Sequence, residues 1–119
     1  MQLQRQIRKG STPVLILSLL AEQSMYGYQI IRELEQRSEG YFAMQEGLLY
    51  PALHQMERDG LLSSEWRTIA GARRRKYYFI TEAGRRVLAN SVREWTTFTE
   101  QLMRMIGGHG HVEPESIPG

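Results

Sequence analysis

The feature that most constrains the fold is a change in the spacing of apolar residues near residue 60. Before it, apolar residues recur every three or four positions, which is typical of helices that bury one face. Residues 61–67 and 73–80 instead form short aromatic and apolar runs, separated by a segment that contains Gly71. This pattern predicts a β-hairpin whose tip uses glycine for a positive φ, with Trp66 fastening the first strand to the core. We therefore expect a mainly helical chain with one two-stranded β-element.

Three helices are expected before the hairpin, and the first is marked by a cap. Thr12 offers a hydroxyl N-cap and Pro13 suits the first helical position, so we expect a helix over residues 14–22. This segment is apolar nearly all round and should lie in the core. Residues 1–10 precede it as a basic, partly helical arm that ends at Gly10.

The second helix is expected over residues 26–37 and the third over residues 48–59. Pro51 places the start of the third helix near Leu48, because proline is tolerated only in the first turn of a helix. The buried stripe of this helix is predicted at helical spacing, at Leu49, Ala52, Leu53 and Met56.

A long last helix follows the hairpin, over residues 82–106. Thr81 is a suitable N-cap, and the helix dipole favours the acidic Glu82 in the first turn. The chain is thus expected to divide into residues 1–81, this helix, and a tail of residues 107–119. The tail is rich in glycine and proline without periodicity, which predicts disorder.

Three helices followed by a two-stranded wing give the order of a winged helix-turn-helix, in which the third helix enters the DNA major groove. The charge distribution fits contact with phosphates at defined places. Residues 1–9 carry three cations and no acid, and residues 67–86 carry seven cations against one acid. Residues 22–65 hold three arginines against eight acids. Charge alone fits two solvated surface patches equally well.

Polar residues of the second and third helices and the wing are the candidates for DNA contact: Tyr28, Tyr50, Pro51, His54, Gln55, Arg73, Arg74, Arg75 and Lys76. Gln55 carries an amide that can pair bidentately with adenine. The four consecutive cations of residues 73–76 repel one another unless an anion such as phosphate relieves them. The alternatives are ordinary exposed polar residues on the helix and an edge strand charged against aggregation.

Several motifs, in this order and spacing, resemble the PadR family of bacterial transcriptional regulators over roughly residues 10–106. They are YGYQI at 26–30, EGLLYPAL at 46–53, RRKYY at 74–78 and ITEAG at 80–84. The resemblance implies a dimeric repressor that leaves its operator when a small-molecule effector arrives. Leu48 holds a position where the family usually has threonine or serine, which can cap the recognition helix or reach a phosphate. Leucine can do neither.

The last helix carries a sustained apolar stripe: Leu88, Val92, Trp95, Phe98, Leu102 and Ile106. A helix this long has more apolar surface than a small domain can cover, which predicts a homodimer with coiled-coil-like packing. Trp95 lies midway along the stripe. At a two-fold axis it could line a slot for a planar aromatic effector, as in some PadR-like proteins, or simply fill the interface.

Other classes of protein find little support. Cysteine is absent, and we find no catalytic arrangement of Ser, His and Asp and no glycine-rich phosphate loop, so we expect neither an enzyme nor a cofactor. His109, His111 and Glu113 lie on the glycine-rich tail, which cannot hold a preformed metal site. No apolar run is long enough to cross a membrane, so we expect a cytoplasmic protein. The main rival is a winged helix that binds proteins instead of DNA.

Overall fold

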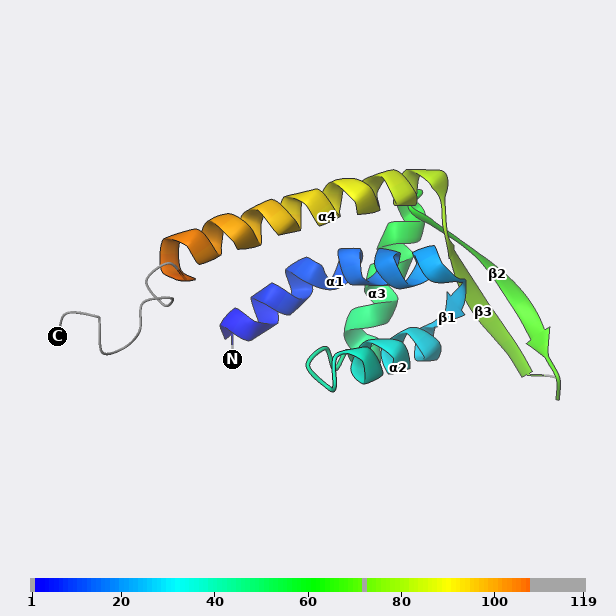
Figure 1. Cartoon of the computed structure of the whole chain (residues 1–119). Helices are drawn as coiled ribbons and strands as arrows, with labels where there is room; N and C mark the ends of the chain where they lie inside the picture. Colours follow the sequence, from blue (N-terminus) through cyan, green and yellow to red (C-terminus); the bar gives the residue numbers. More distant parts are fainter. Residues whose placement is uncertain (1, 72, 108–119) are drawn as a thin grey trace, which may run out of the picture. The chain divides into compact units, whose positions relative to one another are not determined.

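The computed structural model describes residues 2–71 and 73–107 (Figure 1). The helices are α1 (Gln2–Glu22), α2 (Gly27–Arg37), α3 (Glu46–Arg58) and α4 (Glu82–Leu102), and a π-helical turn η1 (Met103–Gly107) follows α4. The strands are β1 (Met25–Tyr26), β2 (Leu62–Ile69) and β3 (Arg73–Ile80). The chain divides into two compact units, Met1–Leu88 and Ala89–Gly119. Gly107, the first residue of the expected disordered tail, is instead buried in η1. The rest of the tail, residues 108–119 with its two histidines, lies outside the described residues.

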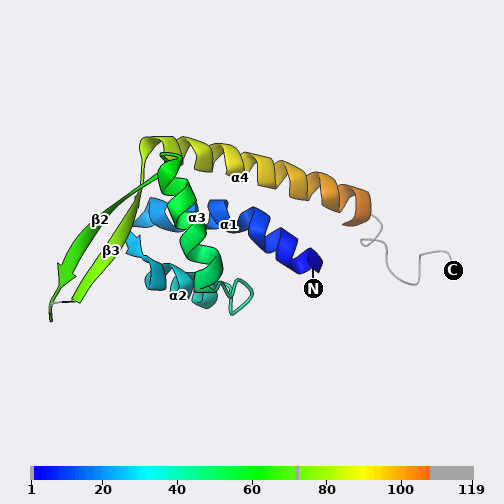
Figure 2. The ribbon, with the colours of Figure 1, turned by 180° about the vertical axis from the view of Figure 1, so that it is seen from behind.

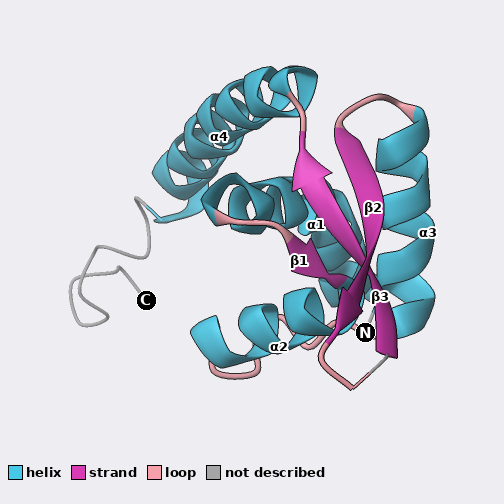
Figure 3. Ribbon diagram, turned by 90° about the vertical axis from the view of Figure 1, so that its right-hand side faces the viewer, coloured by secondary structure: helices cyan, strands magenta, loops and turns pink. Residues whose placement is uncertain are grey.

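The first unit is a winged helix-turn-helix, which confirms the predicted fold. Figure 3 shows α1, α2 and α3 gathered around an antiparallel sheet with the strand order β1-β3-β2. Figure 2 shows the β2–β3 hairpin projecting beyond these helices as a wing. The core combines apolar side chains from all of these elements, and its fully buried large side chains are Ile16, Leu17, Met25, Ile30, Leu49, Leu53 and Tyr78.

Strand β1 is an element that the sequence analysis missed. Met25 pairs with Tyr78 and Tyr26 with Tyr77, so the wing continues into a third strand at the base of the sheet. Tyr26 had been expected in the second helix, but it has an extended backbone and is the N-cap of α2. Two residues are too few to show the alternation by which strands are recognised.

Helix α1 is one element from Gln2 to Glu22, so the expected helix start at Thr12 and Pro13 was wrong. Pro13 lies inside the helix, where it lacks an N–H and its ring crowds the carbonyl of the preceding turn. Figure 1 shows α1 changing direction part-way along, as is usual at an internal proline. Thr12 is buried beside it instead of capping an exposed end.

Helix α3 begins at Glu46, two residues earlier than expected, and Pro51 therefore lies in its second turn. The expectation failed because proline removes only one intrahelical hydrogen bond, the one to the carbonyl of Gly47. Gly47 is exposed, so water can reach that carbonyl. The N-cap is Gln45, and the backbone N–H groups of Leu48 and Leu49 both donate to its carbonyl at 3.0 Å.

The wing is the predicted β-hairpin. Gly71 has a φ of +97° at the hairpin tip, as the turn requires. Directly opposed residues of antiparallel strands share a face, so the pairs Trp66–Lys76 and Ser64–Tyr78 lie on the same side of the sheet. Tyr78 is buried on that side, which is therefore the side that faces the helical core.

Thr81 caps α4 as predicted. The N–H of Gly84 donates to the Thr81 hydroxyl oxygen at 3.0 Å, and that hydroxyl donates to the carbonyl of Gly60 at 2.6 Å. The first turn of α4 is thereby fixed to the end of α3. Among the described helices, none combines the length and the apolar character needed to span a membrane.

Candidate nucleic-acid interface

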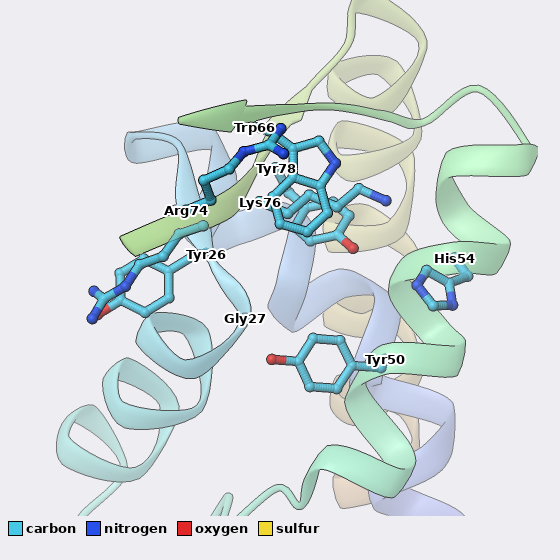
Figure 4. A pocket seen from close by; sticks show the side chains of 9 residues that line it. Tyr26, Gly27, Tyr50, His54, Trp66, Arg74, Lys76 and Tyr78 are labelled. Carbon is cyan, nitrogen blue, oxygen red and sulfur yellow. The ribbon is translucent and has the colours of Figure 1, made fainter. Parts of the chain in front are cut away.

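A pocket of about 380 Å³ lies between α3 and the wing (Figure 4). Its lining comes from the start of α2, from α3 and from both wing strands: Tyr26, Gly27, Tyr50, His54, Trp66, Arg74, Arg75, Lys76 and Tyr78. Aromatic rings and cations thus share one concave surface. Of the predicted contact residues, this pocket brings together Tyr50, His54 and part of the basic run.

On the helix side, Tyr50 and His54 stand one turn apart and both side chains face the pocket (Figure 4). The Tyr50 ring packs over Gly27, where a Cβ would come within 2.5 Å of the tyrosine hydroxyl oxygen. Burial raises the pKa of Tyr50, and the negative charge of Glu46 adds to the effect. The hydroxyl therefore keeps its proton at neutral pH and can donate it to an acceptor.

On the wing side, Trp66 does not fasten β2 to the core as expected. The side chain is 57% exposed, because Trp66 lies on the part of the strand that projects past the helices. The guanidinium of Arg74 lies 5.1 Å from the Trp66 ring, and the ammonium of Lys76 lies 5.4 Å from the ring of Tyr78. The cations on this face thus lie against aromatic rings, which hold them by cation–π interactions.

The other face of the wing repeats this arrangement. The guanidinium of Arg75 lies 4.3 Å from the centre of the Tyr26 ring, and Tyr26 meets Tyr77 edge-to-face at 5.5 Å. A second, more open hollow of about 610 Å³ adjoins it, lined by Tyr26, Tyr28, Arg73, Arg74 and Arg75. The basic run therefore presents cations on both faces of β3.

The arginines of this run lack acidic partners in the part of the chain that the structure describes. In that part, no carboxylate oxygen lies within 4.0 Å, the limit for an ion pair, of a guanidinium nitrogen of Arg73, Arg74 or Arg75. By contrast, Arg67 on β2 pairs with Glu65 at 2.9 Å. Planar guanidiniums resting on rings keep their N–H edges directed outward, an arrangement that suits phosphate.

Glu57 is a residue that the sequence analysis did not single out. It lies in the last turn of α3, and its carboxylate joins the helix to both wing strands. Ser64 Oγ donates to Glu57 Oε2 at 2.5 Å, and Lys76 Nζ lies 3.7 Å from Glu57 Oε1. Burial raises the pKa of Tyr78, and the nearby charge of Glu57 raises it further. An acid in the last turn of a helix, before a basic strand, was the available signal.

A winged helix with this basic, aromatic-lined groove resembles known regulators in sequence as well as in shape. The transcriptional regulator PadR-like family matches residues 16–90 of the chain. The chain belongs to this family. The chain is also similar to transcriptional regulator Rv3488 of Mycobacterium tuberculosis (strain ATCC 25618 / H37Rv), 34% identical over 108 residues that cover 90% of this chain and 94% of that protein.

Solved structures of transcriptional regulators show the same architecture. A PadR family transcriptional regulator from Eggerthella lenta DSM 2243 superposes with a TM-score of 0.75 at 32% identity, over 85% of this chain and 86% of that one. A transcriptional regulator from Clostridium thermocellum gives a TM-score of 0.76 at 26% identity, over 91% of this chain and 96% of that one. The resemblance inferred from the four motifs is thereby confirmed.

Other residues predicted at the PadR-type interface lie outside the pocket between α3 and the wing. Pro51 and Gln55 are exposed on α3. The Gln55 amide donates to Asp59 at 2.9 Å and accepts from Arg58 at 2.8 Å, so it must exchange these exposed contacts to read a base. Leu48 is half-buried against the core, and because Gln45 is the N-cap, leucine at 48 costs the helix no cap.

The second unit carries most of the apolar stripe predicted on the last helix. Phe98 is 56% exposed, and Val92, Leu102 and Ile106 are also exposed within this unit. Trp95 is half-buried and meets Phe98 edge-to-face, with ring centres 6.0 Å apart. Leu88 belongs to the first unit, where it packs against the core. The apolar stripe of the second unit is therefore open to a partner.

Proposed function

We propose that this PadR-family regulator is a homodimeric, sequence-specific DNA-binding repressor that a small-molecule effector releases from an inverted-repeat operator. The observation that carries the proposal is the groove beside α3. Arg74 and Arg75 rest on aromatic rings there, and no described carboxylate pairs with them. Cations held in place without counter-anions are suited to bind the phosphates of a DNA backbone.

The start of α2 adds a second feature that favours phosphate. Its N-cap, Tyr26, makes no side-chain hydrogen bond to the first turn, and Gly27 lines the pocket. Free N–H groups at a helix N-terminus attract anions. With the protonated Tyr50 hydroxyl above Gly27, this corner offers several donors to one backbone phosphate, while His54 and Gln55 extend along α3 toward base edges.

The dimer is proposed from the second unit. A second copy of residues 82–106 would cover the exposed side chains at Val92, Phe98, Leu102 and Ile106. Burying apolar area of this kind is the main driving force of such association. In a two-fold dimer the recognition helices can enter successive major grooves, about 34 Å apart, so the operator would be an inverted repeat. A planar aromatic effector at the two copies of Trp95 would change that spacing.

Selection of bound duplexes from a randomised DNA pool tests the proposal. We expect enrichment of an inverted repeat, with an affinity that falls steeply as salt rises. A protein-binding winged helix would enrich no motif and would show no need for the cations of residues 73–76. Transcription from a promoter that carries the selected site should then fall when the protein is added.

A further inference from the structure

Glu57, in the last turn of α3, is paired with Lys76, which is one of the cations that line the pocket between α3 and the wing. Its side chain is 33% exposed, and that of Lys76 is 31% exposed, so the pair lies at the margin of the interface and not in the core. Their charged atoms are 3.7 Å apart, longer than a hydrogen bond. The stronger contact of Glu57 is the 2.5 Å hydrogen bond that it accepts from Ser64. Lys76 is thus held loosely.

The position of Glu57 is unfavourable on two counts. It lies in the last turn of α3, where the helix dipole disfavours a negative charge. It also adds an anion to a surface that the proposed function places against phosphates, and like charges repel. Folding alone does not require a charge here, because a neutral amide would still accept the hydrogen bond from Ser64.

We propose that Glu57 is an exchangeable counter-anion for Lys76, which positions the lysine ammonium in the free protein and yields it to a DNA phosphate on binding. The inference rests on the proposed DNA binding. Because Glu57 competes with a phosphate for the Lys76 ammonium, it keeps the affinity for DNA below the value that the wing cations alone would give. Ser64 keeps the carboxylate in place after the exchange.

The test measures binding of the full-length protein to a mixed-sequence DNA duplex over a range of salt concentrations. Glu57→Gln removes the charge and keeps an acceptor for Ser64. We expect the affinity for DNA to rise by up to about fivefold, which corresponds to the contribution of a partly exposed ion pair. The slope of log affinity against log salt should steepen by up to about 0.9, for one further phosphate contact.

Two controls separate this role from a general charge effect. Glu65→Gln makes the same change of net charge, but Glu65 pairs with Arg67, which lies over the ring of Tyr77 on the opposite face of the wing. It should change affinity less than Glu57→Gln and leave the slope unchanged. In a Lys76→Met background, Glu57→Gln should lose its effect on the slope.

Three results would overturn the inference: Glu57→Gln that binds no tighter than wild type, a gain matched by Glu65→Gln, or a gain that persists in the Lys76→Met background. Thermal unfolding of each variant shows whether the fold is retained, and Glu57→Ala, which also removes the charge, replaces Glu57→Gln if the amide unfolds the wing. Failure of the wild type to bind DNA would instead refute the proposed function.

Discussion

Tyr50 and Gly27 are fitted to each other: the tyrosine ring fills the space in which a side chain on residue 27 would lie. A Cβ at Gly27 would come 2.5 Å from the Tyr50 hydroxyl oxygen and 2.6 Å from Cε1. The glycine thus lets α3 approach the start of α2. It also fixes where the tyrosine ring lies, and with it the direction of the hydroxyl in the pocket.

Gly27→Ala should therefore weaken DNA binding while leaving the fold intact. The methyl group displaces the far end of a side chain that can rotate into the open pocket, so we expect little change in Tm. Loss of one hydrogen bond to phosphate should lower the affinity about tenfold. A double-mutant cycle with Tyr50→Ala checks the cause: once the ring is gone, Gly27→Ala should have no further effect on DNA affinity. Additive losses would contradict the link.

Wing cations that lack an acidic partner should contribute more to DNA binding than a cation that is already paired with an acid. Replacing Arg74 and Arg75 by Ala should weaken binding to all sequences and flatten the salt slope by up to about 0.9 for each lost phosphate contact. Arg67→Ala is the matched control, because that arginine is already paired with Glu65. It should change the slope little. Equal effects of all three substitutions would show that only net charge matters.

Replacing either of two glycines by alanine should change stability, in opposite directions. A Cβ on Gly84 would lie 2.3 Å from the backbone carbonyl oxygen of Leu61, which cannot rotate away. Gly84→Ala should therefore lower the free energy of unfolding by about 1–3 kcal/mol, as overpacking does. Gly47 lies in α3 with open space around it. Gly47→Ala should raise stability by about 0.5–1 kcal/mol through helix propensity. Thermal or urea unfolding of both variants checks the contrast.

The elements that could be predicted from the sequence are those whose signal is local. Gly71 at the hairpin tip and Thr81 before the last helix act through their own backbone or hydroxyl group, and both behave as expected. The pairing of strand β1 and the exposure of Trp66 depend on tertiary structure. Strand β1 is too short to show an alternating pattern. The exposure of Trp66 depends on how far the wing projects past the helices.

The site shows the same division. Tyr50, His54 and the basic run could be chosen as contacts because their chemistry suits DNA. The contacts of Glu57 with Ser64 and Lys76 join a helix to two strands. Such contacts cannot be predicted from the spacing of residues within one element. The helix starts expected from Pro13 and Pro51 were both wrong, because a helix that is held by its packing tolerates the loss of one hydrogen bond.

The proposed dimer makes a direct prediction. Val92→Glu combined with Leu102→Glu should yield a monomer by analytical ultracentrifugation, because each carboxylate would be buried without a partner at a cost of several kcal/mol. Asn90→Glu combined with Thr97→Glu adds the same charges to exposed positions away from the apolar stripe and should leave the dimer intact. A double mutant at 92 and 102 that stays dimeric would place the interface elsewhere.

The last prediction concerns Trp95 as an effector site. If the two copies of Trp95 line a slot at the dimer axis, planar aromatic compounds should quench tryptophan fluorescence and weaken operator binding. A ligand shifts DNA binding only by its difference in affinity for the two protomer arrangements, and a coupling of about 1–3 kcal/mol gives a usable switch. Trp66 is exposed and lines the pocket between α3 and the wing, so any ligand that binds there quenches it as well. The comparison of wild type with Trp95→Ala, both checked as dimers, separates the two sites. Loss of ligand binding with DNA binding retained supports an effector slot. Equal binding by Trp95→Ala shows that Trp95 only fills the interface.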